Sequence, residues 1–289
     1  QLKFDDLGDI PFLNGGLFEI EPFTSRLPFD LKISNSIFRD VFDTLLEHFN
    51  FTVREDTPLD VEVAIDPEML GRIFENLILQ LERERDLRKM TGSYYTPRVI
   101  VHFMCQQSLK EYLATESQID PARLEMLFEL NPPDQLEDWE VELLKDIVSV
   151  PESRTLRDLA KRAFVLDPAV GSGAFLVNML HEMLTLIKQM DIREHGPEYI
   201  ARRNYDYELK RNIIENCLYG VDILEQAVRI CELRLWLSLV VDYEKEAGEE
   251  VPPLPNLSYQ IKQGDSLIET LFGQRVQLDT FTRTDKGRQ

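Results

Sequence analysis

The sequence is poor in cysteine and has no pattern typical of a structural metal site. Only three cysteines occur among 289 residues, at positions 105, 217 and 231, and no two have the CxxC spacing of zinc ribbons or redox motifs. An odd number of cysteines does not fit a disulfide framework of the kind that secreted domains use. We therefore expect buried free thiols, a cytoplasmic location and no metal ligands.

Long apolar runs and an excess of basic residues are also absent. Apolar stretches such as Leu235 to Val241 are much shorter than a membrane span, and no signal-peptide pattern opens the chain. The net charge is −20, from 52 acidic and 32 basic residues, so the surface does not attract a polyanion. We expect no contact with a membrane. Because the first residue is Gln1 rather than Met, we also expect a piece of a longer protein.

The sequence VLDPAVGSGAFL, residues 165–176, is the most informative stretch. An apolar run ends at Asp167, two glycines follow at positions 171 and 173, and an apolar helical pattern starts at Ala174, which predicts strand, turn and helix. Glycines at the carboxyl end of a parallel strand let a small molecule approach the backbone. A nicotinamide dinucleotide fits poorly, because Leu176 stands where its fingerprint has a third glycine.

The rest of residues 163–289 predicts two more strands that end in acidic residues. An apolar strand over 218–221 ends at Asp222, and an alternating strand over 257–263 ends at Gly264-Asp265. Helical patterns cover residues 174–190, a stretch ending at 216, and 224–243. An α/β fold with parallel strands would therefore gather three acidic groups along one edge of its sheet. Alternatively, Asp167 could simply cap the turn that follows it, and Asp222 could simply cap the helix that starts at Leu224.

The first part of the chain predicts three segments that precede this core. Residues 1–90 form a mostly helical segment, and residues 91–113 a turn and helix with Thr96 as N-cap and Pro97 at the first helical position. Such a helix start could hold a carboxylate, or Tyr94 and Tyr95 could simply pack in the core. Residues 114–162 are acidic, helical in pattern and interrupted by prolines, which indicates an insertion.

These groups suit one ligand class better than others. A turn that takes a carboxylate, Asp167 for an ammonium group, Asp222 for ribose hydroxyls and Asp265 for an adenine amine together match S-adenosylmethionine. No phosphate-seeking lysine lies near the glycine turn, which disfavours ATP. We therefore expect S-adenosylmethionine as the cofactor.

Four motifs, DPAVGSGAFL, GSYYTP, YGVDI and LPNLSYQIKQGDSL, resemble the cofactor-binding motifs of γ-type DNA adenine methyltransferases. Their order is similar to that in the large single-chain enzymes of restriction-modification and phage defence: type IIG, translocating single-polypeptide and BREX-type proteins. The resemblance implies a partial Rossmann-like methyltransferase fold, with residues 163–289 as its N-terminal half, that acts on double-stranded DNA bound through parts outside this chain.

The resemblance also implies roles for individual residues. The methionine end of the cofactor would meet Tyr94, Tyr95 and Thr96; its amino and carboxylate groups Asp167, Ala169, Gly171 and Gly173; the ribose Asp222; and the adenine Asp265 and Leu267.

One motif of that family departs from its pattern here. The family holds the flipped adenine with an Asn-Pro-Pro-aromatic loop after the next strand. The only Asn-Pro-Pro in this chain begins at Asn131, before the glycine turn, and Asp134 follows it. We interpret it as a helix-breaking turn, assign no catalytic residue, and expect the chain to be inactive alone. The alternative is a non-catalytic cofactor-binding or assembly module of a larger machine.

Overall fold

The structure is a computed structural model that describes residues 96–246 and 252–268. It also describes short pieces at 3–4, 8–9, 34–41, 43, 270–271 and 274–275, which hold α1 (Asn35–Val41) and two antiparallel pairs, β1 (Lys3–Phe4) with β2 (Gly8–Asp9) and β6 (Thr270–Leu271) with β7 (Gln274–Arg275). Tyr94, Tyr95 and most of the helical segment expected over 1–90 lie outside the described residues.

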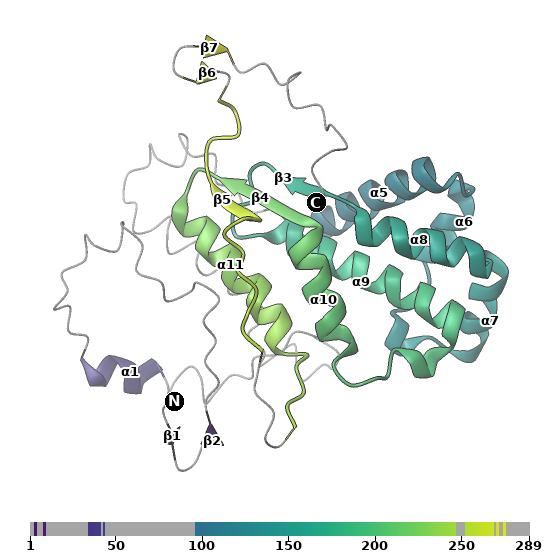
Figure 1. Cartoon of the computed structure of the whole chain (residues 1–289), viewed down its shortest axis with the longest axis horizontal. Coiled ribbons are helices and arrows are strands. Elements are labelled where there is room, and N and C mark those ends of the chain that lie inside the picture. Colours follow the sequence, from purple (N-terminus) through teal and green to yellow (C-terminus); the bar gives the residue numbers. More distant parts are fainter. Residues whose placement is uncertain are drawn as a thin grey trace, which may run out of the picture.

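Three parallel strands form the central sheet (Figure 1). They are β3 (Val165–Asp167), β4 (Leu218–Asp222) and β5 (Ile261–Gln263), in the order β3-β4-β5. Asp167 lies opposite Gly220, and Asp222 lies opposite Gln263, so the carboxyl ends meet at one edge of the sheet. The predicted α/β class with parallel strands is confirmed.

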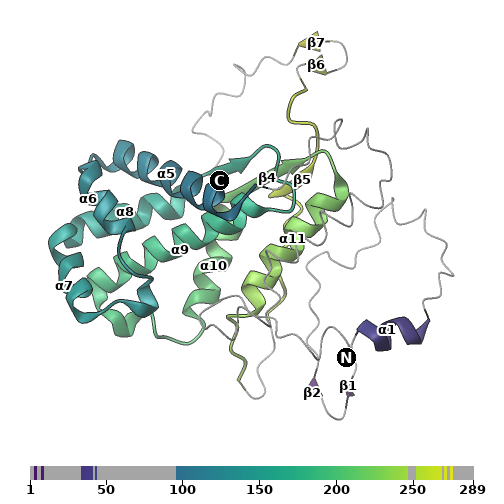
Figure 2. The same ribbon diagram turned by 180° about the vertical axis from the view of Figure 1, so that it is seen from behind.

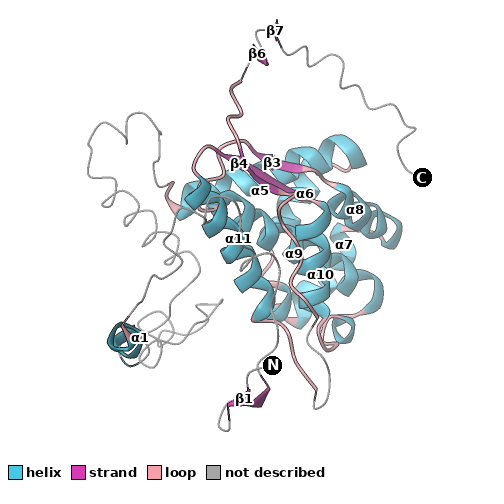
Figure 3. Cartoon of the chain, turned by 60° about the vertical axis from the view of Figure 1, so that its left-hand side comes forward, coloured by secondary structure: helices cyan, strands magenta, loops and turns pink. Residues whose placement is uncertain are grey.

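Long helices connect the strands and cover one face of the sheet. Between β3 and β4 the chain forms α9 (Ala174–His195), η4 (Pro197–Tyr199) and α10 (Tyr205–Asn216), and between β4 and β5 it forms α11 (Glu225–Val240). Figure 3 shows α9, α10 and α11 on one side of the strands. Leu218 and Ile261 are buried on that side, whereas Leu166 and Lys262 alternate with them and are exposed.

The stretch 114–162 packs directly on α9. It contains the end of α5 (Arg98–Ser117), then α6 (Pro121–Phe128), η3 (Pro133–Gln135), α7 (Asp138–Ile147) and α8 (Val150–Arg162). Figures 1 and 2 both show these helices gathered on one side of α9, with α10 and α11 on the other. One hydrophobic cluster joins them to α9, and its fully buried members include Leu113, Leu127, Leu144, Leu156, Leu180, Met183 and Ile187.

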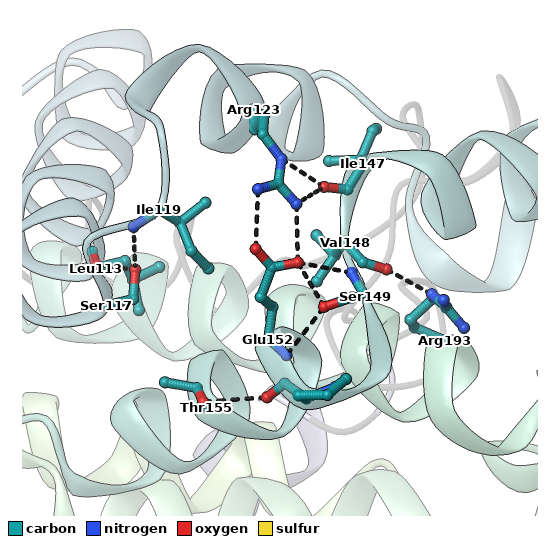
Figure 4. Close-up of polar contacts among 11 residues, drawn as sticks. Leu113, Ser117, Ile119, Arg123, Ile147, Val148, Ser149, Glu152, Thr155 and Arg193 are labelled. Atoms are coloured by element: carbon teal, nitrogen blue, oxygen red, sulfur yellow. Dashed lines mark hydrogen bonds and ion pairs between the residues drawn. The ribbon is translucent and has the colours of Figure 1, made fainter.

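A hydrogen-bonded clamp fixes the start of α8 (Figure 4). Arg123 of α6 donates from both terminal nitrogens to the Glu152 carboxylate, 2.9 Å each, and from Nε to the Ile147 carbonyl at 2.8 Å. Glu152 also accepts from the backbone N–H of Ser149 at 2.8 Å, which completes a capping box. This network joins α6, the end of α7 and α8 into one unit.

The Asn-Pro-Pro sequence is a structural turn between α6 and α7, as predicted. The backbone N–H and the side-chain amide of Asn131 each donate to the buried Glu140 carboxylate at 3.0 Å. Asp134 pairs with Lys188 of α9 at 2.7 Å. Glu140 thus holds both the backbone N–H and the side-chain NH2 of Asn131 within the fold.

The expected start of α5 is wrong by one residue. Pro97 is the N-cap rather than the first helical residue, because its ψ of 138° is extended, and the helix begins at Arg98. No side chain caps this helix start, and the Pro97 carbonyl accepts the first helical hydrogen bonds, from Ile100 and Val101.

Within the described part of the chain, no helix combines the length and the apolar character needed to cross a bilayer.

Candidate functional site

The site is built on the turn that joins β3 to α9. Val170 donates its backbone N–H to the Val221 carbonyl of β4 at 2.9 Å, and Gly173 donates to Val170 at 2.8 Å. Gly171 and Gly173 have φ values of +52° and +87°, in the left-handed region that favours glycine. The two glycines therefore let the turn fold back over the end of β4.

The two glycines face different surroundings. A β-carbon on Gly173 would lie 2.7 Å from the Cys231 sulfur of α11, so this glycine allows close packing of the turn on a helix. A β-carbon on Gly171 would meet no atom within 4 Å. Gly171 therefore presents open space, on the side from which a ligand can reach the backbone.

Asp222 connects the end of β4 to this turn. Its Oδ2 accepts from the Gly171 N–H at 2.8 Å, and its Oδ1 accepts from the Leu224 N–H at 2.9 Å. The second bond is the capping role considered as an alternative, whereas the first joins two strand ends. A carboxylate oxygen has two lone-pair sites, so Asp222 keeps acceptor capacity for a ligand.

Asp167 carries a buried polar atom without a partner. Its Oδ1 accepts from the Ala169 N–H at 3.0 Å, which is the turn-capping role, but its buried Oδ2 accepts no hydrogen bond. Burial raises the pKa of Asp167; the Ala169 hydrogen bond opposes this, and the nearby Asp222 charge adds to it. Since buried polar atoms are almost always paired, Oδ2 is a free acceptor suited to a cationic donor.

The end of β5 completes the site. Gly264 donates its N–H to the Asp222 carbonyl at 2.9 Å, and the Ser266 hydroxyl donates to the Pro168 carbonyl. Asp265 is exposed and accepts from the Leu267 N–H at 2.9 Å, while the Leu267 side chain is 86% exposed. Hydrogen bonds thus link all three strand ends. Ser266 was missed from the sequence, although its place directly after Gly264-Asp265 could have indicated it.

Thr96 is the remaining predicted site residue that the structure describes. It is half-buried just before α5, and α5 packs on α9, where the Cys105 thiol donates to the Phe175 carbonyl at 3.5 Å. Thr96 is not among the residues that the hydrogen bonds of the strand ends join. Those bonds bring together Asp167, Ala169, Gly171, Asp222, Ser266 and, through their own turns, Gly173, Asp265 and Leu267.

A cavity of about 410 Å³ lies beside Asp167, between α5 and β3. Its lining is mainly apolar and includes Met104, Tyr112, Leu166, Asp167 and Phe175. Among the described residues, no three histidine, cysteine, aspartate or glutamate side chains are grouped so that they could hold a metal ion. The described site therefore offers carboxylates, glycine backbone and apolar surface.

Comparison with curated proteins places this geometry in context. The chain is 34% identical, over 297 aligned positions, to a putative type II restriction enzyme and methyltransferase of Methanocaldococcus jannaschii. That match covers 97% of this chain and 23% of the relative. A type II restriction enzyme and methyltransferase of Escherichia coli is 32% identical over 122 positions, which cover 40% of this chain and 12% of that protein.

Both relatives are named as a restriction enzyme and methyltransferase, the first of them as putative. An α/β sheet with three parallel strands is compatible with part of a Rossmann-like fold. The chain spans less than a quarter of the length of these relatives. No family model matches the chain, and no solved structure matches it.

Proposed function

We propose that this chain is the S-adenosylmethionine-binding part of a site-specific DNA adenine methyltransferase in a restriction-modification or phage-defence system. The observation that carries the proposal is the linked edge of the sheet, where the unpaired Asp167 Oδ2 and the open Gly171 lie on one turn. The names of the homologues support the methyltransferase class.

The groups present fit this cofactor. Asp167 would accept from the ammonium group, because its buried Oδ2 needs a donor and a positive ligand would restore the charged form of the carboxylate. Asp222 would accept from the ribose hydroxyls with its remaining lone pairs. Bound S-adenosylmethionine would supply an electrophilic methyl group on its sulfonium.

The adenine end would lie at the third strand. Asp265 would accept from the adenine amine, and the exposed Leu267 would cover the ring, which would remove its apolar surface from water. Gly171 and Gly173 would let the cofactor lie against the turn, next to Ala169. Tyr94, Tyr95 and Thr96 would complete the methionine end.

The chain would bind the cofactor without transferring the methyl group by itself. The one Asn-Pro-Pro of the chain lies between α6 and α7, Glu140 holds the side-chain NH2 of Asn131, and Asp134 stands where a ring would stack on a base. With a net charge of −20, the chain would leave contact with double-stranded DNA to other parts of the protein. There, binding both reactants would place the adenine amine in line with the methyl group.

Calorimetric titration with S-adenosylmethionine tests the proposal. We expect saturable binding to the chain and an affinity about tenfold lower in Asp167→Asn, because the substitution removes a charge-assisted hydrogen bond to the ammonium group. Asp158→Asn, on the exposed side of α8, is the matched control and should bind like the wild type. Equal affinity in Asp167→Asn, or no binding by a folded chain, would contradict the proposal.

A further inference from the structure

A buried arginine lies against the glycine turn from the side of α11. Arg234 is 2% exposed, and its Nη1 donates to the Ser172 carbonyl at 2.9 Å and to the Ser172 hydroxyl at 3.2 Å. Ser172 is itself buried and stands between the two glycines of the turn. A charged side chain thus holds the middle residue of the candidate site from within the core.

The same face of α11 packs on the turn one helical turn earlier. Cys231 and Arg234 are three residues apart, so they lie on one face of the helix. The Cys231 sulfur occupies the space next to Gly173 that a β-carbon would need. Cys231 therefore sets how closely the turn approaches α11, and Arg234 fixes the orientation of the peptide that carries the Ser172 carbonyl.

Burying the charged side chain of Arg234 has an unfavourable desolvation free energy. Removing a guanidinium from water costs several kcal/mol unless hydrogen bonds and charges compensate for it. A leucine would serve packing alone. The guanidinium instead supplies the buried Ser172 carbonyl with a donor, since a buried carbonyl without one is unfavourable.

Asp222 and Arg234, which carry opposite charges, both hydrogen-bond to the backbone of the turn. Asp222 accepts from the N–H of Gly171, and Arg234 donates to the C=O of Ser172, so two successive residues of the turn are each anchored by a charged group. With both anchors in place, the rotation of the peptides at Gly171 and Gly173 is fixed before any ligand arrives. Fixing a site in advance lowers the entropic cost of binding.

We propose that Arg234 is a positioning residue, which holds the glycine turn in the conformation that binds the cofactor. The proposal rests on the proposed function, because its ligand is S-adenosylmethionine. Arg234 would not touch the cofactor; it would act through Ser172.

The test compares S-adenosylmethionine affinity with conformational stability in Arg234→Met and Arg234→Lys. Removing both hydrogen bonds in Arg234→Met should raise the dissociation constant about tenfold, since bonds from a charged donor are among the strong ones. Arg234→Lys keeps the charge and part of the reach, so it should fold and restore affinity to within about threefold of the wild type.

Lys210→Met is the control for a general loss of stability. Lys210 is also 2% exposed and donates to a serine carbonyl, that of Ser238 at 3.2 Å, but it does so at the end of α11 away from the strand ends. It should lower the free energy of unfolding, measured in urea, as Arg234→Met does, and leave the dissociation constant within twofold.

The outcomes separate the two proposals. If the wild type does not bind S-adenosylmethionine, the proposed function fails. If the wild type binds and a folded Arg234→Met binds equally well, or loses only as much affinity as Lys210→Met, the positioning role is refuted. If Arg234→Met does not fold, a folded Arg234→Lys variant whose dissociation constant rises by much more than threefold refutes it instead.

Discussion

Gly173→Ala and Gly171→Ala should affect different properties: the first mainly the stability of the fold, the second mainly cofactor binding. Both glycines have positive φ values and lie in the same turn, so each substitution imposes backbone strain on an L-residue. Only at Gly173 does the new β-carbon meet an atom, the Cys231 sulfur at 2.7 Å, with the Cys231 Cα at 3.4 Å. At Gly171 the methyl group projects into open space.

The structure gives the magnitude of each effect. Left-handed backbone costs about 1–2 kcal/mol for alanine, and overpacking a rigid core adds about 1–3 kcal/mol. Gly173→Ala should therefore lower the free energy of unfolding by about 2–5 kcal/mol. Gly171→Ala should lower it by only about 1–2 kcal/mol, yet its methyl group would project into the space that we propose for S-adenosylmethionine and would weaken binding about tenfold or more.

Urea denaturation followed by Trp236 fluorescence, with titration of S-adenosylmethionine, measures both quantities. Trp236 is buried in α11 and donates to the Pro255 carbonyl at 2.9 Å, so its emission should report unfolding around the site. Adding Cys231→Ala to Gly173→Ala removes the nearest clashing atom and should recover about 1 kcal/mol of stability. Equal stability losses in the two glycine variants, or unchanged affinity in Gly171→Ala, would refute the reasoning.

Three further predictions concern the rest of the described fold. Hydrogen bonds from Arg123, and next from Ser149, lower the pKa of Glu152 to about 2, so its contribution to stability is present above its ordinary pKa of 4.5 and is lost as the pH falls toward 2. Glu152→Gln should therefore cost about 1–2 kcal/mol at pH 7, discounted because both partners are partly exposed, and almost nothing at pH 2; equal losses at both pH values would contradict this. Glu142→Gln, which removes an exposed pair with Lys145, should change stability by less than about 0.5 kcal/mol, and a larger loss would show that exposed pairs matter more here than the geometry indicates. Burial raises the pKa of Cys105 to about 12 and the pKa of Cys217 to about 11, and it also raises the pKa of Cys231. Ellman's reagent should therefore label the native thiols slowly at neutral pH and label all three rapidly in urea. A native thiol that reacts fast would be inconsistent with the packing.

The sequence predicted the ends of β3 and β4 because each combines an apolar run with an acidic residue and a helix start. Asp167 and Asp222 end β3 and β4 as expected, and the Asn131 turn separates two helices. The strand expected over 257–263 is only Ile261–Gln263, because the Leu257 carbonyl accepts from Gln260 and Ile261 and forms a turn first. Alternation of apolar residues does not distinguish such a turn from a strand.

Tertiary contacts account for what the sequence did not predict. The acidic residues and prolines of 114–162 did not indicate how this stretch packs: Leu144 and Leu156 are fully buried and belong to the same hydrophobic cluster as α9. That the stretch is an insertion stays a prediction. Arg234 lies within an apolar helical pattern, where a charge reads as an interruption. Its partner, Ser172, is distant in sequence, so only the folded chain shows the contact.

The most direct test of the proposed site is a hydrogen-exchange footprint of S-adenosylmethionine on the chain. We expect the added cofactor to slow exchange at residues 167–173, 222–224 and 264–267, the three linked strand ends, and to leave the amides of α7 and α8 unchanged. Protection confined to other segments, or none at saturating cofactor, would contradict the proposal that the edge of this sheet is the cofactor site.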